Sequence, residues 1–162
     1  MKCKKCKIKM LYLGSNQNGY YYLCKKCNNV IPTNEKIARS KLIKKLDKVF
    51  SLYIRQRNAI NEISTCFTCG KQDHWKRLQC GHFQSRKHYS TRWDEINCQV
   101  QCAGCNVFKY GEQFIFGKNL DLEYGSGCSE SLYYKAKQIT KYSYDEIEDL
   151  ITKYNLLIKD FI

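Results

Sequence analysis

The sequence has only one proline, Pro32, and three histidines among its 162 residues, and it contains no long apolar run. A membrane-spanning helix needs about 20 consecutive, mostly apolar residues, so the sequence predicts no membrane partner. The first ten residues include five lysines and lack the apolar stretch of a signal peptide. We therefore expect a cytoplasmic protein, in a compartment where thiols stay reduced.

Acidic residues are scarce at the N-terminal end of the chain. Residues 1–60 contain 15 Lys and Arg but only two Asp and Glu, whereas residues 61–162 contain 13 of each class. The whole chain has a formal charge of +13. This one-sided charge indicates an acidic partner, and nucleic acid fits it better than a membrane surface does.

Cysteine is abundant, and its spacing favours metal binding over disulfides. Eight of the 11 cysteines form four CxxC pairs, and two such pairs can complete one tetrahedral zinc site. The remaining cysteines, Cys80, Cys98 and Cys128, are interpreted as small buried residues, although Cys80 and Cys98 could instead join Cys66 and Cys69. We predict two structural Zn²⁺ ions, one held by Cys3, Cys6, Cys24 and Cys27 and the other by Cys66, Cys69, Cys102 and Cys105.

The patterns predict an α+β fold of small zinc-stabilised modules. Residues 1–33 have the pattern of a zinc ribbon, with two strands and a turn between its CxxC knuckles. Residues 34–63 predict a basic amphipathic helix. Residues 64–125 predict a zinc-bound ββα core of the treble-clef type, with a helix that begins at its second knuckle. Residues 126–162 predict a helical region, in which a capping box at Ser143 to Glu146 is followed by an apolar stripe for packing or dimerisation.

Three residues of the central module point to phosphodiester hydrolysis. His82, Asn97 and Asn106 occur in the order of an HNH nuclease site. A histidine can take a proton from water near neutral pH, and Mg²⁺ or Mn²⁺ can supply positive charge. Asn106 is expected to offer its amide oxygen to that metal, and Asn97 to hold the hairpin. A structural or zinc-binding histidine beside turn-forming asparagines is the competing interpretation.

Several motifs resemble the NinG/Rap family of phage recombination endonucleases. They are LDKVFSLYIRQRNA, CFTCGK, CGHFQSR, STRWDEINCQVQCAGCN and GEQF, and the resemblance covers roughly residues 42–160. It implies an HNH-type, metal-dependent nuclease that acts on D-loops or Holliday junctions, in the host cytoplasm if a phage encodes the chain. By this resemblance His82, Asn97 and Asn106 occupy the HNH positions, and Arg86 and Arg92 match arginines of the motifs.

One position departs from the wider HNH pattern. Many HNH sites have an acidic metal ligand directly before the histidine, whereas this chain has Gly81. Asp94, Glu95 and Glu112 are the candidate replacements. We also expect seven basic residues to contact DNA phosphates, namely Lys44, Lys45, Arg55, Arg57, Arg86, Arg92 and Lys109.

The leading hypothesis is a structure-selective DNA endonuclease, expected to be a homodimer because a four-way junction has two strands to cut. Tyr110 and Phe114 would either stack on unpaired bases or, as the safer interpretation, pack in the core. The alternative hypothesis is a non-catalytic zinc protein that binds nucleic acid through a degenerate HNH site, and Gly81 favours it. A homing-type nuclease that cuts linear duplex is less favoured, because no base-reading element is evident.

Overall fold

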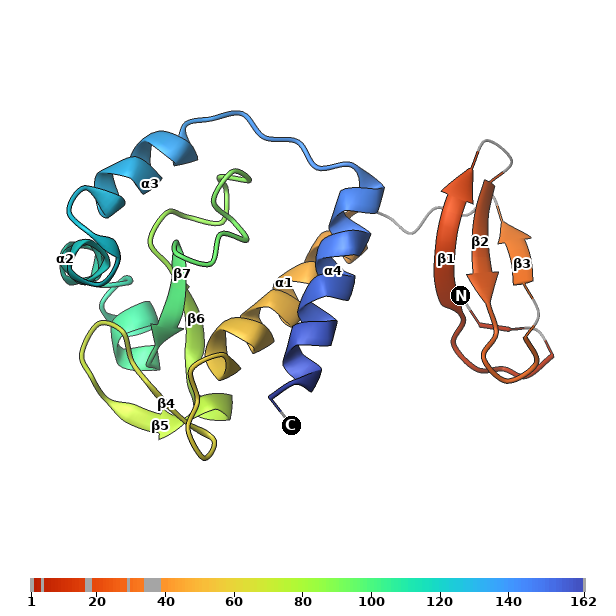
Figure 1. Ribbon diagram of the computed structural model, residues 1–162, viewed down its shortest axis with the longest axis horizontal. Helices are drawn as coiled ribbons and strands as arrows, with labels where there is room; N and C mark the ends of the chain where they lie inside the picture. The colour runs from red at the N-terminus through yellow and green to blue at the C-terminus, as the bar shows by residue number, and fades with distance from the viewer. Residues whose placement is uncertain (1, 4, 17–18, 29, 34–38, 162) are drawn as a thin grey trace. The chain divides into compact units, whose positions relative to one another are not determined.

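The computed structural model describes residues 2–3, 5–16, 19–28, 30–33 and 39–161 of the chain (Figure 1). It divides into two compact units, Met1–Leu42 and Ile43–Ile162. The structure is a small mixture of helices and strands with several cysteine clusters, which confirms the predicted fold class at that level. Among the described residues, no helix is both long and apolar enough to cross a membrane.

The first unit contains a three-stranded antiparallel sheet. Strands β1 (Leu11–Asn16) and β3 (Val30–Thr33) lie on either side of β2 (Gly19–Leu23). The predicted hairpin is present as β1 and β2, and residues 17–18 of its predicted turn lie outside the described residues. Pro32 belongs to the edge strand β3, where a missing backbone donor is tolerated. The small core consists of Cys3, Met10, Tyr22 and Cys24.

Helix α1 (Arg39–Gln56) is shorter than the predicted range 34–63. Residues 34–38 lie outside the described residues. At the other end, Asn61 and Glu62 adopt left-handed φ angles of 48° and 64°. The Ser64 hydroxyl then donates to the Arg55 carbonyl over 2.7 Å. The chain therefore turns back along the end of α1 instead of continuing the helix.

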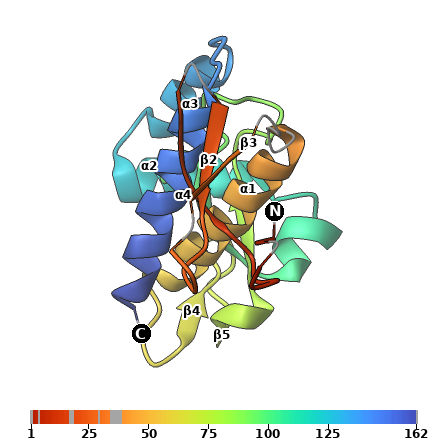
Figure 2. The same cartoon turned by 90° about the vertical axis from the view of Figure 1, so that its right-hand side faces the viewer.

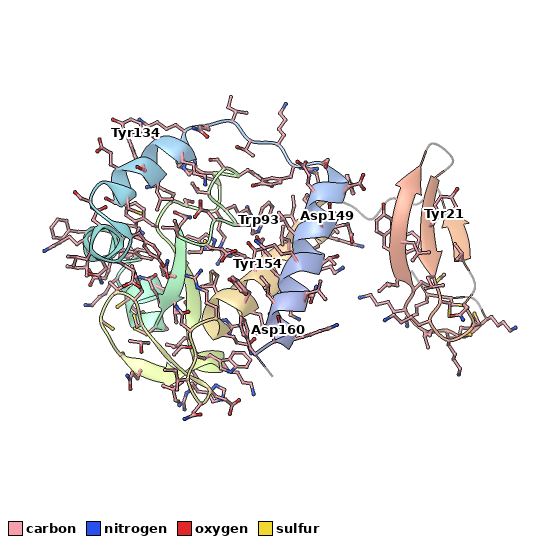
Figure 3. The ribbon with its side chains drawn as sticks, in the orientation of Figure 1. Tyr21, Trp93, Tyr134, Asp149, Tyr154 and Asp160 are labelled. Carbon is pink, nitrogen blue, oxygen red and sulfur yellow. The ribbon has the colours of Figure 1, made fainter. Side chains whose placement is uncertain are left out.

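Helix α4 (Tyr144–Lys159) begins at the predicted capping box, in which Ser143 and Glu146 exchange hydrogen bonds of 2.6 and 3.2 Å. Its apolar stripe packs against α1. The two helices lie side by side (Figures 1 and 2), and Tyr154 projects from α4 (Figure 3). The Tyr154 ring lies 4.9 Å from the rings of both Phe50 and Tyr53, measured between centroids. The stripe that the sequence offered as a dimerisation surface is therefore largely covered within the chain.

Two short hairpins form the central module. Strand β4 (Ile63–Thr65) pairs with β5 (Gln72–His74), and β6 (Gln79–His82) pairs with β7 (Cys98–Gln101), both antiparallel. In the second hairpin His82 lies opposite Cys98. The register thus places the end of β6 beside the start of β7, and it determines to which face of the hairpin the side chains of Cys80, His82 and Cys98 point.

The helix predicted at the second knuckle is interrupted. A single π-helical turn, Gly104–Phe108, precedes α2 (Gln113–Tyr124) and α3 (Cys128–Ala136). Between the π-helical turn and α2, Tyr110 and Glu112 have left-handed φ angles of 53° and 49°, which a continuous helix does not allow. Helices α2 and α3 enclose a second core formed by Phe116, Leu120 and Leu132, with Phe67, Phe83 and Cys128 against it.

One carboxylate joins α1 to the loop between β6 and β7. Asp47 accepts hydrogen bonds from Arg92 Nε (2.9 Å), Arg92 Nη2 (2.6 Å) and Trp93 Nε1 (2.9 Å). Only 22% of the Asp47 side chain and 16% of the Arg92 side chain are exposed. Burial alone would raise the pKa of Asp47, but the bonds and charge of Arg92 lower it below 3.8. The ionised carboxylate therefore stabilises the folded chain.

We expect Asp47→Asn to reduce the free energy of unfolding by about 2 kcal/mol at pH 7, because three N–H groups of Arg92 and Trp93 lose a charged acceptor. Because the folded pKa lies below the unfolded one, this contribution exists above pH 3.8 and is lost as pH falls through the folded value. Urea unfolding of both proteins at neutral and acid pH measures the difference. Asp149→Asn, on the exposed side of α4, is the control; an equal loss there would contradict the assignment.

Candidate functional site

Four thiols from two turns converge in the second unit. Cys66 and Cys69 follow β4, Cys102 and Cys105 follow β7, and their sulfurs all lie within 4.8 Å of one another. Burial opposes ionisation of Cys66, but backbone hydrogen bonds, that of Cys102 first, lower its pKa to about 7. Four clustered cysteine sulfurs, of which Cys66 ionises near neutral pH, are the donor set of a structural zinc site. This cluster could hold zinc.

A second set of four thiols lies in the first unit. Cys3, Cys6, Cys24 and Cys27 again have all sulfurs within 4.8 Å. The Cys3 and Cys27 sulfurs are 3.8 Å apart. This set also fits tetrahedral zinc. The core formed by the described residues of this unit has four buried side chains, and cores of that size are usually stabilised by a metal or another cross-link. Both cysteine tetrads predicted from CxxC spacing are therefore assembled.

His82 is the last residue of β6, and its side chain is half-buried. A ring N–H donates to the Arg92 carbonyl, with 3.1 Å between Nε2 and the oxygen. Burial, followed by the positive charge of Arg86, lowers the pKa of His82 to about 4. The imidazole is therefore neutral at physiological pH, the form that can accept a proton or bind a metal.

Asn97 is fully buried and holds the loop that follows β6. Its side-chain amide donates to the carbonyls of Gln84 (3.0 Å) and Thr91 (2.9 Å), and its oxygen accepts the Gln84 N–H (2.7 Å). Asn97 does not line the pocket that His82 faces. These bonds give Asn97 a positioning role toward the loop that carries Arg86.

Asn106 and the space beside Gly81 lie on the other face of β6. The Asn106 amide donates to Gln79 Oε1 over 2.6 Å. A Cβ atom at Gly81 would lie 2.0 Å from Gln101 Oε1, so Gln101 occupies the place of any side chain there. Gln101 Oε1 is buried and has no hydrogen-bond partner among the described residues. Restoring an acidic residue at 81 would require Gln101 to move.

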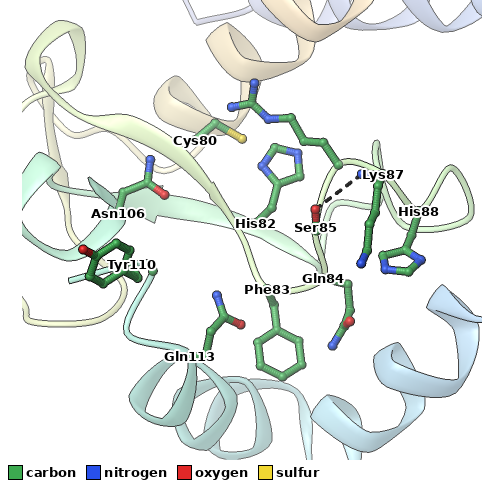
Figure 4. Close-up of a pocket in the computed structure, with 12 residues that line it drawn as sticks. Cys80, His82, Phe83, Gln84, Ser85, Lys87, His88, Asn106, Tyr110 and Gln113 are labelled. Carbon is green, nitrogen blue, oxygen red and sulfur yellow. Dashed lines mark hydrogen bonds between the residues drawn. The ribbon is translucent and has the colours of Figure 1, made fainter. Parts of the chain in front are cut away.

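Both faces open into one pocket of about 590 Å³ (Figure 4). Its described lining includes His82 and Asn106 together with the cationic side chains Arg86 and Lys87. No Asp or Glu is among the described residues that line it. The pocket is therefore suited to an anionic group. Its lining residues are Cys80, His82, Phe83, Gln84, Ser85, Arg86, Lys87, His88, Asn106, Tyr110, Gly111 and Gln113.

The three candidate acidic ligands are engaged elsewhere. Asp94 accepts the N–H groups of Ile96 and Asn97 and pairs with Lys135. The Glu95 carboxylate accepts hydrogen bonds from Tyr53 (2.7 Å) and Tyr154 (3.2 Å), between α1 and α4.

Glu112 pairs with Lys109 over 2.8 Å, and neither of the two lines the pocket. Mg²⁺ is usually bound through carboxylates, water and substrate phosphates. The described lining offers the amide oxygens of Gln84, Asn106 and Gln113 instead. These residues do not make a Mg²⁺ site by themselves.

Three of the seven expected DNA contacts are instead committed to the fold. Arg55 donates to the Trp75 carbonyl over 3.2 Å, and Arg57 donates to the Glu95 carbonyl over 2.9 Å. Arg92 pairs with Asp47, as described above. Their guanidinium groups thus satisfy carbonyl and carboxylate partners within the chain and do not form an open phosphate-binding face. Arg86, Lys44 and Lys45 are exposed, and Lys109 is exposed beside its partner Glu112.

Sequence reasoning misjudged one feature near the pocket and missed another. Phe108, Tyr110 and Phe114 are 78%, 90% and 76% exposed, so core packing, the favoured interpretation of Tyr110 and Phe114, is wrong. The interrupted helix turns these rings outward. Cys80 and Cys98, interpreted as spare buried residues, are indeed buried but lie together beside His82. The alternation of Cys80 and His82 along a strand was the signal in the sequence.

One family model matches most of the chain. It is described as NinG: Bacteriophage Lambda NinG protein, and it matches residues 31–161. The match includes every residue of the pocket and the second cysteine tetrad. No curated protein and no solved structure matches the chain.

Proposed function

We propose, because the chain belongs to the NinG family of phage recombination-related proteins, that it is an HNH-type, metal-dependent DNA endonuclease that acts on branched recombination intermediates. The observation that carries this proposal is the pocket in which His82, Asn106 and cationic side chains meet. A neutral histidine supplies a base, and Arg86 and Lys87 supply charge for a phosphate.

His82 and Asn106 line the same pocket, although His82 comes from one face of β6 and Asn106 contacts Gln79 on the other face. In phosphodiester hydrolysis the attacking water and the leaving oxygen lie on opposite sides of the phosphorus. A phosphate bound in this pocket would have the proposed base and the proposed metal ligand within the same lining. Asn97 would hold the loop with Arg86 in place.

The catalytic cation would depend on the substrate for part of its coordination. Because the described lining has amide oxygens but no carboxylate, phosphate oxygens and water would have to complete the ligand set. A bound Mg²⁺ or Mn²⁺ would supply positive charge for the leaving oxygen. Within the chain, His82 would take the proton of the attacking water, and Arg86 would bind the phosphate.

Exposed aromatic rings beside the pocket favour DNA with unpaired bases. Phe108, Tyr110 and Phe114 project from the turn that carries Asn106 and from the start of α2. Lys118 Nζ lies 5.8 Å from the centre of the Phe114 ring, so charge accompanies the rings. Proteins bind single-stranded DNA by such combinations of stacking and phosphate contacts. We therefore assign the surface formed by these three rings to unpaired bases at a branch.

A non-catalytic DNA-binding protein is the second candidate function. The described pocket lining has no carboxylate, and Gln101 fills the place where many HNH sites have an acidic ligand. The cysteine tetrads, the basic residues and the aromatic surface would serve binding equally well. The two functions differ in cleavage and not in affinity.

His82→Ala tests the catalytic assignment. We expect it to reduce cleavage of D-loop DNA by about 10²–10⁴-fold, because the proposed base is lost, and to leave the affinity for that DNA unchanged. His88→Ala is the matched control, because His88 lines the same pocket without a proposed catalytic role. Single-turnover cleavage and fluorescence anisotropy measure the two quantities. Equal losses of cleavage in both variants would argue against His82 as the base.

Tyr110→Ala and Phe114→Ala test the aromatic surface. Each should weaken binding to D-loop DNA by about 1–3 kcal/mol, because one stacked base loses its partner. Affinity for fully paired linear duplex should not change. Tyr134→Ala removes a ring on α3 that is 58% exposed and serves as the control. A uniform loss on both DNA substrates would show that the rings do not recognise unpaired bases.

A further inference from the structure

The face of β6 that carries His82 also carries a cysteine that neither tetrad uses. Side chains alternate along a strand, so Cys80 and His82 point to the same face. The antiparallel register places Cys98 opposite His82. The two sulfurs and a ring nitrogen all lie within 4.8 Å of one another, the same spacing that the two cysteine tetrads satisfy.

We propose that Cys80, His82 and Cys98 form a third metal site, which binds a thiophilic divalent cation such as Zn²⁺. Two thiolates and one imidazole are a known zinc donor set, with the fourth position left to water or another ligand. Two thiolate charges balance the charge of the ion. A neutral complex suits this location, because Cys80 is 4% exposed and Cys98 is fully buried.

The contacts around these residues support a single binding point. The Arg92 carbonyl accepts a hydrogen bond from His82 Nε2 over 3.1 Å and one from Cys98 Sγ over 3.6 Å, so it holds the ring and the thiol side by side. A neutral ring that donates through Nε2 has its lone pair at Nδ1, the nitrogen that would bind the ion. Cys80 and His82 also line the 590 Å³ pocket, which gives an ion access from solvent (Figure 4). The ligands come from paired strands, so the backbone fixes their separation without help from a loop.

Occupation of this site would remove His82 from catalysis. An imidazole whose lone pair is bound to Zn²⁺ no longer accepts a proton from water, so Zn²⁺ at this site inhibits cleavage. This consequence rests on the proposed function. The metal site itself does not, because binding can be measured without any cleavage. Zn²⁺ inhibition would thus act through ligands that Mg²⁺, which prefers oxygen, does not use.

Counting bound zinc in the full chain tests the site. Native mass spectrometry during a Zn²⁺ titration should show three ions in the wild type, namely one in each cysteine tetrad and one in the proposed site. Cys80→Ser and Cys98→Ala should each bind one ion fewer than the wild type. Cys128→Ser is the matched control, because Cys128 belongs to none of the three groups, and it should retain the wild-type count.

Two results would overturn the site. One is a wild-type count that saturates at the two tetrad ions, and the other is a third ion that both Cys80→Ser and Cys98→Ala retain. If Cys98→Ala does not fold, the wild-type count and the count for Cys80→Ser still decide.

A separate experiment titrates Zn²⁺ into the cleavage reaction in Mg²⁺. Loss of cleavage with filling of the third site supports the inhibitory role, and undiminished cleavage refutes it. If the wild type cleaves no DNA, only the proposed function is refuted, because the zinc counts still decide the metal site.

Discussion

The convergence of Cys66, Cys69, Cys102 and Cys105 is the constraint on which the second unit depends. Cys69 and Cys102 are 33 residues apart, yet their sulfurs lie 3.8 Å from each other. Strands β6 and β7 lie between the two turns in sequence, and each has only four residues. So short a hairpin is not stable alone, and a Zn²⁺ ion held by the four thiols would fix where it meets the Asn106 turn. The Asp47 contacts then attach α1 to this arrangement.

Short-range patterns in the sequence identified the parts whose chemistry is local. CxxC spacing predicted both tetrads, and the Ser143 capping box predicted the start of α4, because each depends on residues a few positions apart. The orientation of charged and aromatic side chains depends on distant partners. The sequence pattern placed Arg57 on the basic side of a helix, but it directly follows α1, and its acceptors, including the Glu95 carbonyl, are 38 or more residues away. Likewise, the left-handed residues Tyr110 and Glu112 turned expected core rings outward.

The pocket combines two kinds of donor that the sequence did not separate. Cys80, His82 and Cys98 lie on the same face of the β6–β7 hairpin. A one-residue shift in the register of β6 would have moved Cys80 and His82 to the opposite face. On the other face, Gln101 fills the space beside Gly81, and Asn106 contacts Gln79. Soft donors thus lie with the proposed base, and neutral amides lie where a hard cation would be needed. The proposals of a substrate-dependent Mg²⁺ or Mn²⁺ for cleavage and of Zn²⁺ for inhibition both rest on this division.

We propose that this pocket hydrolyses DNA at branches. The most direct measurement compares wild-type cleavage of a labelled D-loop with cleavage of linear duplex of the same sequence, in Mg²⁺ or Mn²⁺ and with chelator added. We predict nicks near the branch that require the added cation, and little cutting of the linear duplex. Tight binding of both DNA substrates without cleavage in either cation would contradict it and would identify the second unit as a DNA-binding module.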